Sequence, residues 1–163
     1  VIGLSGMGLL LKSDPPRGDG AREYGFGVVG EFDPPLSLGG LLERVCERLS
    51  LKHLVYAGDA SVTVRRCAVS GGAGGGAIER ILHEHDVDCV ITGDVGYHDV
   101  KASLDRSVPV IDAGHFGTER ILLDFLCADI QDYLTKSSSA GHIRACVSRM
   151  EADPFRVYLP EKR

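Results

Sequence analysis

The sequence predicts an α/β fold, a mainly parallel, twisted sheet with helices on its faces. Three apolar runs, 66–69, 89–92 and 108–111, are typical of buried strands because they are short, rich in β-branched residues and followed by glycine or polar residues. Segments with helical periodicity, about 77–85 and 100–104, separate the runs. Strands that alternate with helices are usually parallel and joined by helical crossovers, so we expect these three strands to be parallel.

The first part of the chain lacks regular periodicity. Residues 12–20 are rich in proline, glycine and aspartate, which favour turns, so we expect a loop there. Residues 24–32 alternate small and large side chains, as a strand that lies close to another backbone does. We therefore divide the chain into an irregular or partly disordered segment, 1–35, and one α/β domain, 36–163.

Ser37 can cap the first helix of this domain, because its hydroxyl can accept a hydrogen bond from the exposed N–H groups of the first turn. The helix carries its apolar residues on one stripe, at Leu41, Leu42, Val45, Cys46 and Leu49. The elements expected next are strands at 53–57 and 62–69, a helix at 77–85, strands at 87–92 and 108–111 around a helix at 100–104, and a helix at 118–134. We expect the tail to add two short edge strands, 142–148 and 155–159.

Composition excludes several classes of function. No run of about 18 apolar residues indicates a membrane span. A net charge of −5 and an isoelectric point near 5.6 argue against nucleic acid as the main partner. The five cysteines include no C-x-x-C pair, which favours a reducing compartment. We expect a cytoplasmic protein, with an organellar location as the alternative because the chain begins at Val1 rather than at a methionine, so its natural amino terminus is not seen.

Two pairs of polar side chains follow the second and third predicted strands, each pair four positions apart. These are Asp94 with His98, and His115 with Glu119. An imidazole and a carboxylate with this offset at a strand-to-helix turn can reach a common metal ion. The alternative for the second pair is structural, with Glu119 capping the helix and His115 hydrogen-bonded nearby. By contrast, His83 and His85 are two positions apart and point in different directions on a helix, which predicts a solvated helix end.

A glycine-rich loop that includes Gly71, Gly72, Gly74 and Gly75 follows the first of the three strands. Its backbone N–H groups could contact an anion or a substrate. The loop matches neither the P-loop nor the dinucleotide-binding pattern. A tight turn without ligand contact explains the glycines equally well.

Three motifs in order resemble the carboxy-terminal half of the Nif-three-like dinuclear metal protein family, whose members carry the name GTP cyclohydrolase I type 2. The motifs are residues 68–75, residues 91–94 with Tyr97, His98 and Asp99, and residues 111–115 with Thr118, Glu119 and Arg120. The likeness extends over roughly residues 24–160.

This resemblance implies a two-lobed fold, a pair of divalent metal ions (zinc, iron or manganese) in each full-length subunit, and homohexamers. It also implies that His115 and Glu119 are metal ligands and that Asp94 and His98 lie close to the site. The family's other ligands come from a His-His motif and an Asn-Leu-Asp motif, and this chain contains neither a His-His pair nor an asparagine. We expect those motifs in a lobe that precedes Val1, so the ions are weakly held or absent in this chain alone.

The resemblance implies a metal-dependent hydrolase of the Nif-three-like type, in which metal-activated water attacks a nucleotide-like or other phosphate-bearing small molecule. Asp94 and His98 would be catalytic, and Gly71, Gly72, Gly74 and Gly75 would approach the substrate. The alternative is a non-catalytic interaction or assembly module that retains the fold with an incomplete metal site. In either case we expect the protein to form homo-oligomers.

Overall fold

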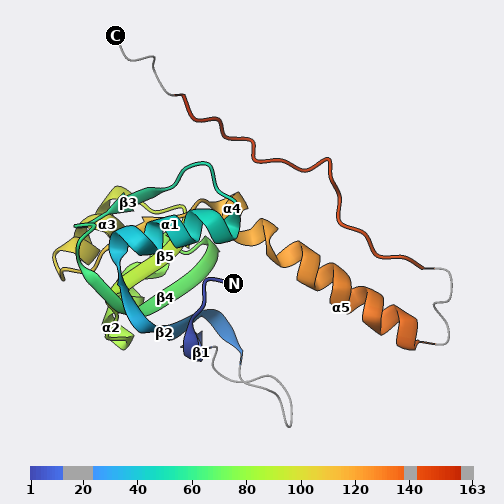
Figure 1. Ribbon diagram of the computed structural model, residues 1–163, viewed down its shortest axis with the longest axis horizontal. Coiled ribbons are helices and arrows are strands. Elements are labelled where there is room, and N and C mark those ends of the chain that lie inside the picture. The colour runs from blue at the N-terminus through green and yellow to red at the C-terminus, as the bar shows by residue number, and fades with distance from the viewer. Residues whose placement is uncertain (13–23, 138–142, 159–163) are drawn as a thin grey trace. The chain divides into compact units, whose positions relative to one another are not determined.

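The computed structural model describes residues 1–12, 24–137 and 143–158 (Figure 1). The chain forms two compact units, Val1–Thr118 and Glu119–Arg163. The first unit contains a β-sheet with helices on both faces, and the second contains one long helix, after which the described residues 143–158 form neither helix nor strand.

The sheet of the first unit has six strands in the order β1-β2-β4-β5-β6-β3. The strands are β1 (Ser5–Lys12), β2 (Gly25–Ser37), β3 (Val55–Ala57), β4 (Thr63–Ala73), β5 (Cys89–Gly93) and β6 (Val110–Asp112). As predicted from the three apolar runs, β4, β5 and β6 are parallel. The other pairings, β1 with β2, β2 with β4 and β3 with β6, are antiparallel. The α/β class is confirmed, and the sheet as a whole is mixed because antiparallel strands flank its parallel centre.

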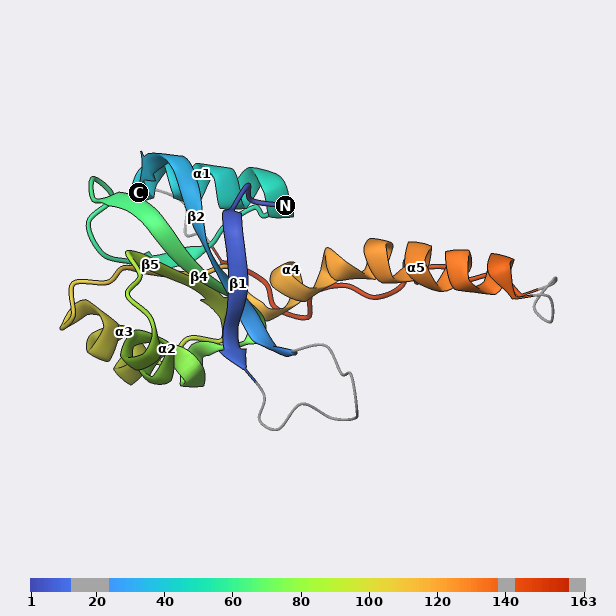
Figure 2. The ribbon, with the colours of Figure 1, turned by 90° about the horizontal axis from the view of Figure 1, so that it is seen from below.

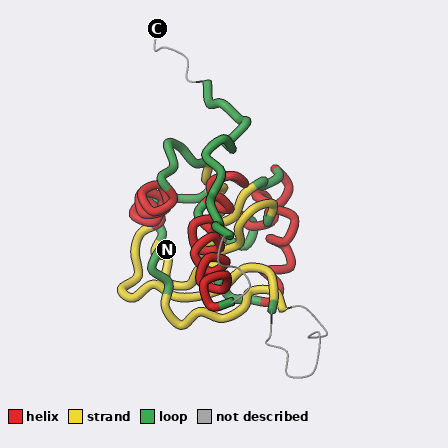
Figure 3. Tube along the Cα trace, turned by 90° about the vertical axis from the view of Figure 1, so that its right-hand side faces the viewer, coloured by secondary structure: helices red, strands yellow, loops and turns green. Residues whose placement is uncertain are grey.

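Helices cover the two faces of this sheet. They are α1 (Leu38–Leu49), the short 3₁₀ helix η1 (Gly75–Ala77), α2 (Ile78–Glu84) and α3 (Tyr97–Leu104), and a further short helix, α4 (His115–Arg120), follows β6. In Figure 2, α1 lies on one face of the sheet and α2 and α3 lie on the other. The strands can be followed in yellow in Figure 3.

Side-chain alternation along the central strands produces one apolar cluster on each face. Cys67 and Cys89 point toward the α1 side, where they pack with Leu38, Leu41 and Val45. The residues that follow them in β4 and β5 belong to the cluster on the α2 side, which comprises Leu10, Leu11, Val29, Ala68, Ile78, Ile81, Val87, Val90 and Val110. Burial in this environment raises the pKa of the Cys67 thiol well above its usual value, and the adjacent Cys89 thiol raises it further.

The prediction that Ser37 caps the first helix is confirmed. Its side-chain oxygen accepts a hydrogen bond from the backbone N–H of Gly40 at 3.1 Å. The helix ends at Ser50, whose φ of 54° places it in the left-handed region that commonly terminates helices. The cap therefore fixes where β2 stops and α1 begins.

The prediction for the amino-terminal segment needs correction. The strand indicated over 24–32 is confirmed as part of β2, but β1 also lies within the segment 1–35 that we expected to be irregular, and β2 continues without a break through position 36. In the antiparallel pairing of the two strands, each strand supplies hydrogen-bond partners for the backbone N–H and C=O groups of the other. Most of the loop expected over 12–20 lies outside the described residues.

The second unit differs from the sequence prediction in two ways. The helix expected over 118–134 is divided into α4 and α5 (Leu122–Lys136). The edge strands expected in the tail do not form among the described residues, because positions 143–158 contain no strand. Within the parts of the chain that the structure describes, no helix is both long and apolar enough to cross a lipid bilayer.

Candidate functional site

The candidate site lies at the carboxyl ends of β4, β5 and β6. Because these three strands are parallel, the polar and glycine residues that follow them converge at one edge of the sheet, as predicted. The backbone N–H of Ala113, just after β6, donates to the carbonyl oxygen of Thr92 in β5 at 2.8 Å. The loops after β5 and β6 are therefore held against each other.

Asp94 and His115 meet across these two loops. The His115 Nδ1 atom lies 2.7 Å from the Asp94 Oδ2 atom, although the residues are 21 positions apart in the chain. The His115 side chain is 45% exposed and the Asp94 side chain is 51% exposed, so both can contact a ligand from solvent. When the Asp94 carboxylate is ionised it can only accept, and Nδ1 of His115 is then the donor in this contact.

The backbone of Asp94 has an uncommon conformation. Its φ of 54° lies in the left-handed region, where aspartate is less disfavoured than most residues but still strained. The preceding residue, Gly93, is in close contact with both neighbouring loops. A Cβ atom there would lie 2.8 Å from the Gly72 carbonyl oxygen and from the His115 backbone nitrogen. Only glycine fits at this point, and the chain turns immediately after it to present the Asp94 carboxylate.

Asp112 holds the loops of the pair together, and the sequence analysis did not single it out as a site residue. Its Oδ2 atom accepts a hydrogen bond from the Val95 backbone N–H at 3.0 Å, and its Oδ1 atom accepts one from Gly114 at 2.9 Å. Val95 follows Asp94 directly, and Gly114 directly precedes His115. One carboxylate thus connects the two backbone segments that carry the pair.

The glycine loop is packed tightly against the ends of β4 and β5. Gly72, Gly74 and Gly75 are buried, and Gly71 is exposed. A Cβ atom on Gly75 would lie 2.3 Å from the carbonyl oxygen of Asp94. The Gly72 N–H donates to the Thr118 hydroxyl at 2.9 Å. Close packing therefore accounts for Gly74 and Gly75 without a ligand, while exposed Gly71 remains the candidate for substrate contact.

The remaining two predicted site residues lie on helices beside this edge. His98 is exposed at the start of α3, and its ring makes an edge-on contact with Tyr97 at 5.5 Å between ring centroids. Glu119 is exposed in α4, one helical turn after His115. Asp94 contacts His115, whereas the His98 ring contacts Tyr97, so the pair that organises the site is Asp94 with His115 rather than Asp94 with His98.

His115 fits the role of a metal ligand, because an imidazole nitrogen is a ligand type that zinc, iron and manganese accept. Asp94 contacts its Nδ1 atom and can hold the ring in place. A tightly bound transition metal usually needs three or four protein ligands. Among the described residues, no group of three or more histidine, cysteine, aspartate or glutamate side chains is arranged to hold an ion. Further ligands are therefore required for tight binding.

The His83-Glu84-His85 segment is at the end of α2, away from this edge, and its two imidazoles have different environments. His83 is exposed, as expected for a solvated helix end. The prediction is wrong for His85, which is half-buried and whose Nε2 atom contacts the carbonyl oxygen of Leu10 in β1. This contact joins the helix end to the antiparallel edge of the sheet.

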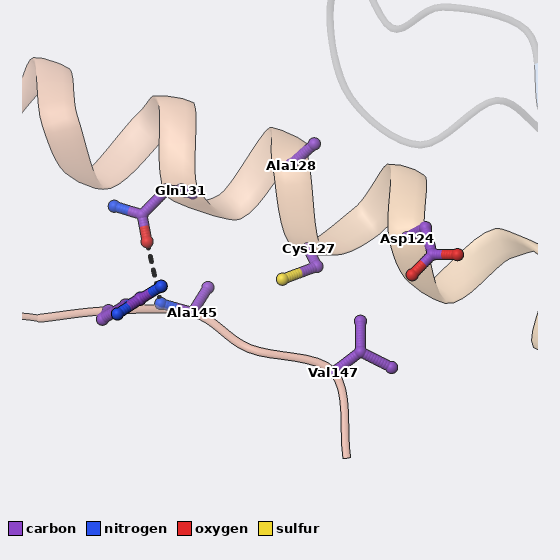
Figure 4. A pocket seen from close by; sticks show the side chains of 7 residues that line it. Asp124, Cys127, Ala128, Gln131, Ala145 and Val147 are labelled. Atoms are coloured by element: carbon purple, nitrogen blue, oxygen red, sulfur yellow. Dashed lines mark hydrogen bonds between the residues drawn. The ribbon is translucent and has the colours of Figure 1, made fainter. Parts of the chain in front are cut away.

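The second unit has an open pocket of its own between α5 and the segment that follows it (Figure 4). The side-chain oxygen of Gln131 accepts a hydrogen bond from the Ala145 backbone N–H at 2.9 Å. The Cys127 side chain points into the space between helix and segment in Figure 4. The polar side chains among the residues that line the pocket are Asp124, Gln131 and Arg144.

Sequence reasoning missed three residues that build the site. Asp112 and Thr118 bind backbone N–H groups from neighbouring loops, and Thr92 forms a buried hydrogen bond with Ser70. Each of these contacts joins residues that are far apart in the sequence, so local sequence patterns do not reveal it. The available signal was the position of Asp112 directly after a buried strand, but the same position is also typical of an ordinary turn residue.

Comparisons with known proteins identify the family to which the chain belongs. The family model for Duf34/NIF3 (NGG1p interacting factor 3) matches residues 2–154. The GTP cyclohydrolase 1 type 2 homolog of Clostridium acetobutylicum is 31% identical over 96% of this chain and 56% of its own length. The NIF3 homolog of Schizosaccharomyces pombe is 29% identical over 83% of this chain and 48% of its own. The chain thus spans about half the length of the curated relatives it matches.

Solved structures show the same fold. A Bacillus cereus protein related to NIF3 superposes with a TM-score of 0.75 at 26% identity, covering 85% of this chain and 37% of that protein. A Staphylococcus aureus protein gives a TM-score of 0.73 at 24% identity over 83% of this chain and 43% of its own. The family match over nearly the whole chain and the shared fold lead to one conclusion: the chain belongs to the DUF34/NIF3 family.

Proposed function

We propose that this chain forms part of a metal-dependent hydrolase that acts on a nucleotide-like or other phosphate-bearing small molecule. The observation that carries the proposal is the Asp94–His115 contact at the carboxyl edge of the parallel strands, where α/β proteins commonly bind ligands. Relatives named GTP cyclohydrolase 1 type 2 homolog support the reaction class. The substrate class rests on that likeness alone.

In this proposal His115 and Glu119 bind a divalent cation, and other ligands come from outside this chain. When bound, the cation supplies a water molecule of lowered pKa as the nucleophile. The Asp94 carboxylate accepts from Nδ1 of His115 and orients the ring. His98 is exposed on the neighbouring helix and would transfer a proton. Gly71 would let the substrate approach the backbone closely.

Metal analysis tests the ligand assignment. The chain is loaded with Zn²⁺, dialysed stepwise and analysed for zinc by mass spectrometry. We expect weak binding that is lost on long dialysis, and at least tenfold weaker binding in the His115→Ala and Glu119→Ala variants. His83→Ala is the matched control, because His83 is an exposed histidine outside the site. Unchanged zinc binding in His115→Ala would contradict the assignment.

A second candidate is a non-catalytic interaction or assembly module with an incomplete metal site. It is favoured by the absence of any three-ligand cluster in the described ranges. The two candidates differ in one measurement. In the full-length protein, a hydrolase releases product from nucleoside triphosphates in the presence of divalent metal and loses this activity in His115→Ala, whereas an assembly module shows no turnover in either form.

We also propose that the protein forms homo-oligomers. Large apolar side chains on α5 are exposed, with Leu122 58%, Phe125 60% and Tyr133 73% accessible. Exposed apolar surface of this kind often marks a protein interface. Light scattering across micromolar concentrations should give a mass above 17.5 kDa, and a strictly monomeric mass would contradict the proposal.

A further inference from the structure

We infer that Asp112 is a positioning residue that sets the orientation and tautomer of His115. The inference goes beyond the proposed function, because it assigns a role to a carboxylate that has no place in the metal-ligand scheme. It draws on the proposed function only for the importance of His115. The contacts that carry it are within the first unit and involve no metal.

Asp112 is placed to control both halves of the pair. Its two oxygens accept from the N–H of the residue after Asp94 and from the N–H of the residue before His115, at 3.0 and 2.9 Å. Each oxygen serves a different loop. Without this connection, the loops after β5 and β6 could move apart by small backbone rotations, and the contact between the Asp94 and His115 side chains would be lost.

The strained backbone of Asp94 makes this connection necessary. A residue with φ of 54° adopts that conformation only where its surroundings hold it. The bond from Val95 N–H to Asp112 restrains the peptide directly after Asp94. The carboxylate of Asp94 is thereby aimed at Nδ1 of His115, and the 2.7 Å contact places the proton on that nitrogen. The Nε2 atom then has the lone pair that metal binding or proton acceptance requires.

The test reads the tautomer of His115 in metal-free protein. Long-range ¹H–¹⁵N NMR spectra at about pH 8, where an ordinary imidazole is neutral, distinguish a ring protonated on Nδ1 from one protonated on Nε2. The His115 signals are assigned by their loss in His115→Gln. The wild-type chain should show the Nδ1–H form. Asp112→Ala and Asp94→Ala should shift His115 toward the Nε2–H form that isolated imidazole prefers.

Asp88→Ala is the matched control. The Asp88 carboxylate also accepts two backbone N–H groups, from Arg65 and Arg66 at 2.9 and 2.8 Å, and so has the same number of bonds. It is near the start of β5 rather than its carboxyl end. The control should lower the unfolding midpoint to a similar degree and leave the His115 tautomer unchanged.

A graded variant keeps the inference testable if Asp112→Ala does not fold. In Asp112→Asn one oxygen remains, so one loop stays attached and the other is released. His115 should then show broadened signals or a mixture of the two tautomers. An unchanged Nδ1–H form in both Asp112 variants, or an equal shift in Asp88→Ala, would overturn the inference. Failure of zinc binding with the tautomer effect intact would refute only the proposed function.

Discussion

The hydroxyl groups of Ser70 and Thr92 form a buried hydrogen bond of 3.0 Å directly beneath Gly74. The two residues belong to the neighbouring parallel strands β4 and β5, and both are almost inaccessible to solvent. The glycine loop rests on this pair. Its sequence is therefore constrained by what lies under it, whether or not a ligand binds above it.

The Gly74→Ala variant should be strongly destabilised. The added Cβ atom would lie 2.0 Å from the Thr92 hydroxyl oxygen and 2.3 Å from that of Ser70, so the buried hydrogen bond and the loop must shift. Overpacking of this kind costs about 1–3 kcal/mol of unfolding free energy, and loss of the buried bond adds to it. Urea denaturation followed by circular dichroism measures the change.

Gly76→Ala provides the comparison. Gly76 is exposed, and a Cβ atom there would meet nothing within 4 Å. This variant should be neutral or stabilised by about 0.4–1 kcal/mol, because alanine restricts the unfolded chain more than glycine does. Equal destabilisation of the two variants would show that Gly74 is not held by the packing described.

Ser37→Ala should destabilise the protein by about 1 kcal/mol, because the Gly40 N–H loses the side-chain oxygen that caps α1. Ser37→Asp should recover the lost stability, since aspartate is an equally good cap and adds a favourable charge at the helix N-terminus. Thermal melts of the three proteins test this. If Ser37→Asp melts as low as Ser37→Ala, the hydroxyl does not act as a cap.

The sequence was sufficient for the parallel centre of the sheet, because each strand there is a short apolar run ended by glycine or polar residues. It was insufficient for β1, whose glycine-rich residues become a strand only by pairing with β2. It also led us to expect two strands in the tail, and positions 143–158 form none. The pattern of apolar residues predicts a strand where the strand is buried in the core. It does not predict a strand that forms only because a neighbouring strand pairs with it.

The candidate site shows the same division. Asp94 and His115 were both identified from the sequence, but each was matched with a residue four positions away, because helical spacing is the relation that a sequence displays. Their contact with each other depends on β5 and β6 being neighbours in register. Asp112 was missed for the same reason, since its bonds become visible only when the two loops are placed side by side.

Thiol reagents should distinguish the cysteines by burial. Cys67 and Cys89 are inaccessible in the folded protein, whereas Cys146 is exposed. Burial also raises the pKa of Cys67, which keeps its thiol protonated and unreactive. With iodoacetamide at about pH 8, Cys146 should react within minutes, and Cys67 and Cys89 only after urea is added. Peptide mass spectrometry identifies the sites, and rapid native labelling of Cys67 would contradict the buried arrangement.

The raised pKa of Cys67 also predicts how stability depends on pH. In the unfolded chain the thiol ionises near its ordinary value of 9.0, while in the folded protein it remains protonated to a higher pH. The folded state therefore binds more protons than the unfolded state above about pH 9, and stability falls as pH rises by up to about 1.4 kcal/mol per pH unit for one thiol. Below that pH the ionisation of this thiol has no effect on stability.

Because lysines and tyrosines titrate in the same range, the measurement compares the wild type with Cys67→Ala by urea denaturation from about pH 7 to pH 10. The alanine variant should be less stable at neutral pH and should lose less stability as pH rises, so that the two curves approach each other. If the two curves were parallel across the whole range, the Cys67 thiol would ionise equally in the folded and unfolded states. That result would contradict the prediction, which rests on the complete burial of Cys67 in the folded protein.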